Sequence, residues 1–255
     1  MPVEYSQLDE LALITLNRPE ALNALSVQVV REIGEAIDKA AASDARALLI
    51  TGAGKKAFCA GADISEFMGR TVVEALEAAE FGQNTFAKLD NLRIPSLAVI
   101  NGYALGGGLE LATACTLRVA TANANLGVPE IKLGLIPGYG GTQRLPRLIG
   151  QGRALDMVMT GRMVGAEEAL GIGLINRIVE TPALDGAVEY AREFAGFSLP
   201  VLRYSREAVM RADQSSLSEG LQIERDLNTL AFQGEDSTEG AMAFLEKRTP
   251  KFQDK

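Results

Sequence analysis

The sequence predicts an α/β fold with a helical C-terminal part, on the strength of three observations. Apolar, β-capable runs alternate with helical stretches over the first 150 or so residues, which favours a sheet with a parallel component. One of these runs, Ser96–Ile100, is continuous rather than alternating and suits a strand buried on both faces. Beyond Gly150 the pattern changes to several helices separated by glycines. We therefore expect an α/β core over residues 1–195 and a helical oligomerisation region over 196–255.

The individual elements follow from hydrophobic spacing and from their end signals. Leu11–Leu16 is an expected strand that stops before Pro19, because proline lacks the N–H group that a strand ladder needs. Ser26 is the expected N-cap of a helix whose apolar residues recur at helical spacing. The further expected strands are Ala45–Thr51, Ser96–Ile100 and Ile175–Val179. The further expected helices are Thr71–Leu89, Leu109–Cys115, Arg153–Thr160, Ala166–Leu170, Leu184–Phe197, Val201–Arg211, Leu217–Phe232 and Ser237–Lys247.

Composition narrows the class of protein. The 255 residues are 47% hydrophobic and 23% charged, as in soluble globular proteins. The net charge of −8 opposes binding to nucleic acid or to an anionic membrane, both of which need a basic face. The chain has two cysteines, Cys59 and Cys115, which do not form a C-x-x-C pair; because disulfide scaffolds use many more, a reducing compartment is favoured. No apolar run approaches the ~20 residues of a membrane span. We expect a cytoplasmic protein.

The chain contains no histidine, and this excludes several mechanisms. A Ser-His-Asp triad, a Cys-His pair and an H-E-x-x-H zinc site are all ruled out. Proton transfer must fall to carboxylates, Lys, Tyr or Cys. The glycines do not form a nucleotide site either, since the segment around Gly52 lacks the P-loop pattern and no G-x-G-x-x-G occurs at Gly52, Gly106 or Gly138. We expect no metal and no cofactor.

Three consecutive glycines, Gly106–Gly108, come directly before the expected helix Leu109–Cys115. Glycines at a helix start let the backbone approach a ligand closely and leave unpaired N–H groups there. Such donors suit an oxyanion that develops on a thioester carbonyl. The alternative is a tight turn that packs a helix against a strand.

Two glutamates lie among apolar neighbours near these glycines. Glu110 falls in the first helical turn, and Glu130 follows Val128-Pro129. Taken alone, Glu110 is also explained as a partner of the helix dipole, and Glu130 as a turn or cap carboxylate. Two carboxyl groups at one substrate would have coupled titrations and at least one raised pKa, so that one acts as acid while the other acts as base.

At this point the residues resemble a known family. In order along the chain they are Asn17-Arg18-Pro19 with Ala21-Leu22-Asn23-Ala24-Leu25, Ala60-Gly61-Ala62-Asp63, Gly106-Gly107-Gly108-x-Glu110, Pro129-Glu130, Gly134-x-x-Pro137-Gly138-x-Gly140-Gly141-Thr142-Gln143-Arg144-Leu145, and the C-terminal Phe244-Leu245-x-Lys247-Arg248-x-Pro250-x-Phe252. Together they are similar to the signatures of the enoyl-CoA hydratase (crotonase) family, and most similar to a bacterial short-chain enoyl-CoA hydratase. The resemblance implies a crotonase-like spiral core of repeated ββα units with a C-terminal helical appendage.

The resemblance also implies site residues. The backbone N–H groups of Ala62 and Gly107 would form the oxyanion hole, and Glu110 and Glu130 would be the two catalytic glutamates. The walls of the acyl-CoA site would come from Leu22, Ala24, Ala60, Ala62, Asp63, Ile64 and Gly107. The acyl pocket would be shaped by Phe67–Leu89 and by the surroundings of Tyr139.

Relatives in this family assemble as trimers and hexamers, so a homotrimer or homohexamer is expected by analogy. The basic tail Lys247–Lys251 is either a solvated chain end or, as in relatives, a segment that reaches the CoA of a neighbouring subunit.

The expected function is enoyl-CoA hydration, in which water adds across the 2,3 double bond of a 2-enoyl-CoA to give a 3-hydroxyacyl-CoA. We assign Glu110 to water activation and Glu130 to the proton at Cα. Fatty-acid β-oxidation, aromatic-acid degradation and butanoate metabolism all use this hydro-lyase step. An enoyl-CoA isomerase or another acyl-CoA enzyme of the same fold is the alternative, and an RNA-associated binding protein of this fold is a remote one.

Overall fold

The computed structural model describes residues 1–66 and 69–255 and contains two β-sheets. The strands are β1 (Val3–Leu8), β2 (Leu11–Leu16), β3 (Ala47–Gly52), β4 (Ala57–Cys59), β5 (Ser96–Ile100), β6 (Tyr103–Leu105), β7 (Leu117–Thr121), β8 (Asn125–Gly127), β9 (Met163–Gly165) and β10 (Arg177–Val179). The α-helices are α1 (Val27–Ala42), α2 (Val72–Asp90), α3 (Gly107–Ala114), α4 (Gly141–Ile149), α5 (Gln151–Thr160), α6 (Ala166–Gly171), α7 (Ala183–Ala195), α8 (Leu199–Arg211), α9 (Leu217–Gln233) and α10 (Glu235–Glu246). Short 3-10 helices are η1 (Pro19–Ala21), η2 (Ile64–Glu66), η3 (Pro129–Leu133) and η4 (Ala212–Gln214).

The first sheet has six strands in the order β1-β2-β3-β5-β7-β10. All its neighbours are parallel except β1 and β2, which form an antiparallel hairpin. Leu48 and Ile50 of β3 face the main core, whereas Leu49 packs with Ala187 and other alanines of α7 on the opposite face. Both faces of the sheet are therefore buried, which explains the continuous apolar runs in its strands.

The second sheet contains four strands in the order β4-β6-β8-β9. Each of β3, β5 and β7 continues into a short strand of this sheet, namely β4, β6 and β8, and the chain then forms a helical segment. This is the repeated ββα arrangement that the resemblance implied. Because β4, β6 and β8 are parallel neighbours, the segments that follow them begin at the same edge of the second sheet.

Several expected elements are confirmed. β5 has the predicted bounds Ser96–Ile100, and the side chain of Ser26 accepts a hydrogen bond from the N–H group of Val29 as the N-cap of α1. The helix expected at Leu109–Cys115 instead begins at Gly107, because Gly106 takes a backbone conformation (φ 51°, ψ −125°) that ends the preceding strand and is open to glycine. Local sequence patterns did not predict the edge strand β1, the strands β4, β6, β7, β8 and β9, or the helix α4.

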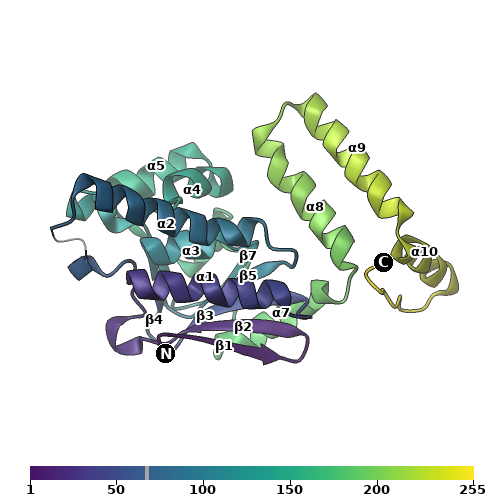
Figure 1. Cartoon of the computed structure of the whole chain (residues 1–255), viewed down its shortest axis with the longest axis horizontal. Helices are drawn as coiled ribbons and strands as arrows, with labels where there is room; N and C mark the ends of the chain where they lie inside the picture. Colours follow the sequence, from purple (N-terminus) through teal and green to yellow (C-terminus); the bar gives the residue numbers. More distant parts are fainter. Residues whose placement is uncertain (67–68) are drawn as a thin grey trace.

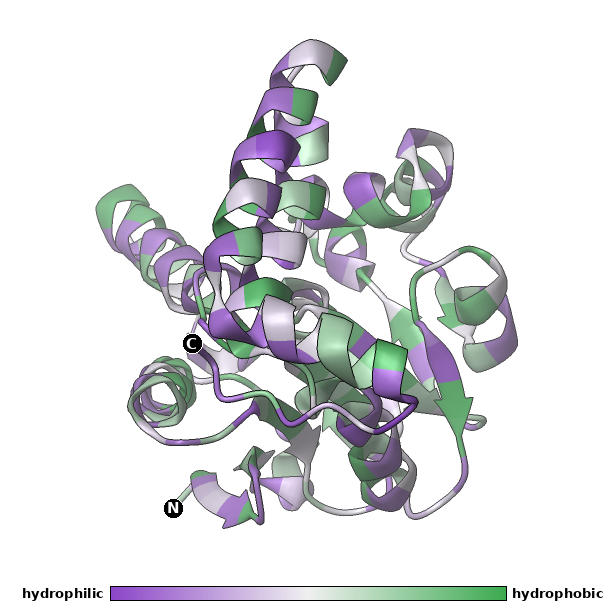
Figure 2. Cartoon of the chain, turned by 90° about the vertical axis from the view of Figure 1, so that its right-hand side faces the viewer, coloured by the Kyte–Doolittle hydropathy of each residue, from purple (hydrophilic) through white to green (hydrophobic). Residues whose placement is uncertain are grey.

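Beyond α7 the helices α8, α9 and α10 extend away from the sheets as an arm (Figure 1). Hydrophobic residues alternate with hydrophilic ones along the arm (Figure 2). No residue of α9 is buried. The exposed apolar side chains of the arm include Val209, Leu217, Leu221, Leu230, Phe232, Phe244 and Leu245. The arm falls within the expected 196–255 region, whose boundary and oligomerisation role stay predictions.

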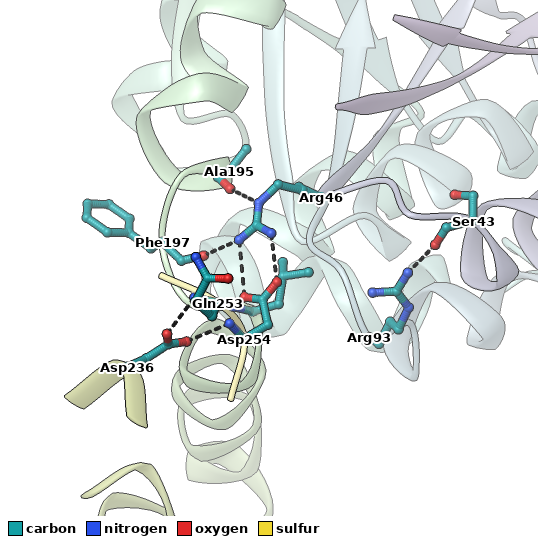
Figure 3. Close-up of polar contacts among 9 residues, drawn as sticks. Ser43, Arg46, Arg93, Ala195, Phe197, Asp236, Gln253 and Asp254 are labelled. Carbon is teal, nitrogen blue, oxygen red and sulfur yellow. Dashed lines mark hydrogen bonds and ion pairs between the residues drawn. The ribbon is translucent and has the colours of Figure 1, made fainter. Parts of the chain in front are cut away.

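Polar contacts fasten the C-terminal end to the core (Figure 3). The Arg46 guanidinium donates from Nε to Ala195 O (2.5 Å) and from Nη2 to Phe197 O (2.8 Å), and it forms an ion pair with Asp254 (2.7 Å). The buried Asp236 carboxylate accepts from the N–H groups of Gln253 (2.6 Å) and Asp254 (2.9 Å). The last residues of the chain are thus tied to both the core and α10.

Arg248, in the basic tail Lys247–Lys251, forms ion pairs with residues of the arm. Arg248 forms ion pairs with Glu239 and Glu246, each at 2.6 Å. The N–H group of Lys251 also donates to Glu239 (2.7 Å), and the contacts from Arg248 and Lys251 lower the pKa of Glu239 to about 2. Arg248 is therefore no freely solvated charge.

Candidate active site

The segments around Leu22–Leu25 and Ala60–Asp63 lie side by side through backbone hydrogen bonds. The N–H group of Leu25 donates to Gly61 O (2.8 Å), and that of Asp63 donates to Leu25 O (2.9 Å). This parallel bridge leaves the N–H group of Ala62 directed away from residue 25, and it donates no hydrogen bond within the described part of the chain. Ala62 thus presents a free backbone donor.

The second predicted donor, the N–H group of Gly107, is the first of α3 and has no partner inside its helix. Among the described residues it donates to no other group either. A side chain is excluded at Gly108, since a Cβ atom there would lie 2.1 Å from Cys59 O, and a Cβ atom at Gly106 would be in van der Waals contact with the Cα atom of Gly61 at 3.8 Å. The start of α3 is consequently packed against the segment that carries Ala62, which brings the two predicted oxyanion donors into one region.

Glu110 lies in the first turn of α3 and is only 2% exposed. Its Oε1 atom accepts hydrogen bonds from the N–H groups of Tyr139 and Gly141, both at 2.7 Å. Burial raises the pKa of Glu110, while these two bonds and the charge of Arg144 act in the opposite direction. The carboxyl group is therefore held in one orientation by backbone donors inside an apolar site.

Glu130 lies in η3, directly after β8. Its Oε2 atom is buried and has no hydrogen-bond partner among the described residues, and a Cβ atom at Gly106 would lie 2.8 Å from its Oε1 atom. Burial raises the pKa of Glu130 to about 7, and the charge of Glu110 adds to the rise. The structure thus places Glu130 beside the start of α3 and in electrostatic contact with Glu110.

The turn at Gly138–Gly141 has a part in the site that the sequence analysis did not predict. Its amides at Tyr139 and Gly141 hold Glu110, and the ring of Tyr139 packs edge-on against Phe86 with centroids 5.5 Å apart. A Cβ atom at Gly107 would lie 3.4 Å from the Tyr139 ring, so this ring borders the oxyanion region. Gly140 and Gly141 lie at the start of α4, as Gly106–Gly108 lie at the start of α3. Nothing in the local sequence, however, links Gly140 and Gly141 to Glu110.

The predicted substrate-binding residues come from the two hydrogen-bonded segments Leu22–Ala24 and Ala60–Ile64, together with the buried Gly107 at the start of α3. Leu22 and Ile64 are exposed, whereas Ala24, Ala60 and Asp63 are half-buried. Asp63 forms an ion pair with Arg18 (3.6 Å), and hydrogen bonding from Ser65 together with the Arg18 charge holds the pKa of Asp63 below its usual range. Of the predicted acyl-pocket wall, Phe67 and Met68 lie outside the described residues.

Asn23 supports the predicted substrate-binding segment Leu22–Ala24, and the sequence did not indicate this role. Asn23 is buried, and its Nδ2 atom donates to Ala53 O (3.0 Å) and Ala57 O (2.8 Å). Leu22 and Asn23 both have positive φ values, 51° and 57°, a conformation that asparagine tolerates better than most residues. The side chain of Asn23 therefore anchors the unusual backbone that carries Leu22 and Ala24.

No group of three or more His, Cys, Asp or Glu side chains among residues 1–66 and 69–255 is placed to hold a metal ion. Within the same residues, no helix combines the length and the apolar character that a bilayer crossing requires.

The sequence is similar to those of known proteins. The sequence model of the enoyl-CoA hydratase/isomerase family matches residues 7–255. A probable enoyl-CoA hydratase of Mycobacterium bovis is 47% identical over 246 residues, which cover 95% of this chain and 94% of that protein. A short-chain-enoyl-CoA hydratase of Clostridium acetobutylicum is 39% identical over 94% of this chain and 92% of its own length.

Solved structures show the same fold. The crystal structure of an enoyl-CoA hydratase from Bacillus anthracis has a TM-score of 0.95 and 37% identity, with 100% of both chains covered. The match extends over the two sheets and the C-terminal helices alike. By sequence and by fold, the chain belongs to the enoyl-CoA hydratase/isomerase family.

Proposed function

We propose that this protein is an enoyl-CoA hydratase, a hydro-lyase that adds water across the 2,3 double bond of a short-chain 2-enoyl-CoA. The observation that carries the proposal is the pairing of two carboxyl groups with raised pKa values, Glu110 and Glu130, beside the N–H groups of Ala62 and Gly107, which donate to no group in the described part of the chain. The family's isomerases and other acyl-CoA enzymes need the oxyanion donors as well. The acid pair favours hydration among these reactions.

In the proposed reaction, water adds at Cβ and negative charge builds on the thioester oxygen. The amides of Ala62 and Gly107 donate to this oxygen, an effect worth roughly 3 to 4 kcal/mol per donor in comparable sites. Glu110, held through Oε1, takes a proton from the attacking water. Glu130, whose pKa is about 7, gives a proton to Cα, and this step completes the addition. No cofactor takes part in this scheme.

The CoA portion is proposed to lie along the backbone of Leu22, Ala24, Ala60, Asp63 and Ile64. We further propose a homotrimer or homohexamer, supported by the exposed apolar side chains on the arm, such as Leu217, Phe232 and Phe244. Light scattering during size-exclusion chromatography tests this, because a trimer has three times the 27.1 kDa of the chain. We also propose a cytoplasmic setting, supported by the cysteine usage of the sequence, and fatty-acid β-oxidation as one of the pathways that use this step.

The decisive assay is the loss of the conjugated-enoyl absorbance when crotonyl-CoA is mixed with the protein. Mass spectrometry of the product formed in ¹⁸O-water separates the alternatives, since hydration incorporates solvent oxygen and isomerisation does not. We expect one ¹⁸O atom in a 3-hydroxyacyl-CoA product. Absence of turnover with short, medium and dicarboxylic enoyl-CoAs would overturn the proposal. Salt-sensitive RNA binding without turnover would instead support the RNA-associated alternative.

A further inference from the structure

The turn that holds Glu110 is itself held by helix α2. At its first residue, Gly138 O accepts a hydrogen bond from Nε2 of Gln83 (2.8 Å). The ring of Tyr139 fits against Gly82, where a Cβ atom would lie 2.3 Å from the ring. α2 therefore carries the turn, although it contributes no hydrogen bond to Glu110 in the described structure.

The other attachment is an ion pair at the end of α2. Asp90, the last residue of this helix, pairs through Oδ2 with Nη2 of Arg144 (2.7 Å). The Nη1 atom of the same guanidinium donates to Tyr139 O (3.2 Å). These side chains are 31% and 20% exposed, respectively, so the pair is partly shielded from solvent. One planar group thus links the end of α2 to the middle of the turn.

Gly140 makes this contact possible. A Cβ atom at this position would lie 2.3 Å from Nη1 of Arg144, and the φ value of 113° disfavours any other residue. The Gly140 carbonyl also accepts from the N–H groups of Gln143 and Arg144 at the start of α4. The backbone of the turn and the guanidinium therefore fit together at close range.

We propose that Asp90 and Arg144 are positioning residues for Glu110: their ion pair holds the turn in the conformation in which the amides of Tyr139 and Gly141 bind Oε1. The catalytic consequence rests on the proposed function, whereas the effect on the turn does not. Neither side chain needs to touch the substrate. A carboxylate that must abstract a proton loses rate steeply when its placement is relaxed.

A purely electrostatic role for the pair predicts different behaviour. The charged and titratable groups that act on Glu110 are Arg144 on α4, Glu130 on η3 and the phenol of Tyr139. Replacing Asp90 by asparagine removes a negative charge and so, by charge alone, would lower the pKa of Glu110. Loss of the two N–H bonds would raise it. The direction of the change therefore distinguishes positioning from simple charge.

The test uses Asp90→Asn and Arg144→Lys in the full-length protein. The lysine keeps the positive charge but lacks the planar fork that reaches Asp90 and Tyr139 O together. Glu193→Gln serves as the matched control, because it breaks a two-bond pair with Arg177 (2.6 and 2.7 Å) on α7 and β10, away from the turn. All variants are first compared with the unaltered protein by thermal unfolding.

Hydrogen exchange at the amides of Tyr139 and Gly141 and hydration of crotonyl-CoA are then measured across pH. We expect both test variants to exchange these amides about 10-fold faster and to lose about 10- to 100-fold in kcat with KM little changed. The acidic limb of the kcat profile, where activity rises as Glu110 ionises, should move to higher pH. The control should match the unaltered protein in amide exchange, in kcat and in the position of the acidic limb.

Wild-type exchange and kcat in both test variants would overturn the proposal. A shift of the acidic limb of the kcat profile to lower pH in Asp90→Asn, with kcat preserved, would also overturn it. That result is expected if Asp90 acts on Glu110 through its charge alone. Unchanged exchange rates and kcat in Arg144→Lys alone would likewise contradict a role for the guanidinium fork. If the unaltered protein does not hydrate enoyl-CoA, the proposed function fails. The positioning proposal is then decided by the amide exchange rates together with a ¹³C NMR titration of the Glu110 carboxyl group.

Discussion

Gly106 and Glu130 are in such close contact that a Cβ atom at residue 106 would lie 2.8 Å from Oε1 of the glutamate. The two residues come from different ββα units, β6–α3 and β8–η3. Gly106 also has a φ of 51° and a ψ of −125°, outside the regions open to residues with a side chain. The absence of a side chain at residue 106 therefore lets one proposed catalytic acid approach the oxyanion region.

Substitution of this glycine provides the first prediction. Gly106→Ala should reduce kcat for crotonyl-CoA hydration by about 100-fold, because the methyl group displaces Glu130 and strains the backbone beside Gly107. Gly152→Ala in α5 is the control, since no described atom beyond its chain neighbours and the surrounding helix backbone lies within 4 Å of the added Cβ. Steady-state kinetics on both variants check the prediction, and equal kcat values would contradict it.

The two glutamates should each be needed for the chemical step. Glu110→Gln and Glu130→Gln keep the size of the side chains but remove their proton transfer, so each should lower kcat by about 10²- to 10⁴-fold with KM largely preserved. Isothermal titration with a non-reactive acyl-CoA separates binding from chemistry. Full activity in either variant would show that the assigned roles are wrong.

The raised pKa of Glu130 predicts a particular dependence of rate on pH. A proton donor with a pKa of about 7 is protonated below that value, so kcat/KM should fall as pH rises through about 7. Substrate binding and the ionisation of Glu110 can move the observed midpoint, because the two groups titrate as a coupled pair. A rate profile that stays flat between pH 6 and 8.5 would argue against Glu130 as the acid.

The raised pKa of Glu130 also predicts that ionisation of this side chain lowers the stability of the folded protein. Because the folded-state pKa of Glu130 lies above its ordinary value of 4.5, the folded protein is relatively favoured below pH 4.5 and loses this advantage as pH rises to about 7. Glu130→Gln should therefore be more stable than the unaltered protein at pH 8, by about 2 kcal/mol once partial exposure is allowed for, and similar to it near pH 4.5. Urea unfolding at the two pH values measures the difference.

The contacts of Arg46 predict unequal effects of two arginine substitutions. Arg46→Met removes bonds to Ala195 O and Phe197 O and the pair with Asp254, so it should lower the free energy of unfolding by about 2 kcal/mol. Arg192→Met breaks only exposed pairs with Asp9 and Glu10 and should cost less than about 1 kcal/mol. Urea unfolding at equal protein concentration compares them, and equal losses would contradict this ranking.

Long, strongly patterned elements were predictable from local sequence. β5 and the Ser26 cap of α1 are present as expected because continuous apolar runs and cap residues act within a few positions of the chain. Short strands such as β4, β6 and β8 were missed, since their few residues are too short to show a period. The edge strand β1 was missed because its burial is mostly partial or absent, which weakens the hydrophobic pattern.

The sequence by itself determined which groups are available for proton transfer. Without histidine, the carboxyl groups of Glu110 and Glu130 were the foremost candidates, and the ordered motifs linked them to glycines at helix starts. Only the tertiary structure decided how these carboxyl groups are held. The amides that bind Glu110 lie 29 and 31 residues further along the chain, and the pKa of Glu130 follows from burial created by packing. Local pattern specifies the chemistry of a side chain, whereas its environment depends on segments that only folding brings together.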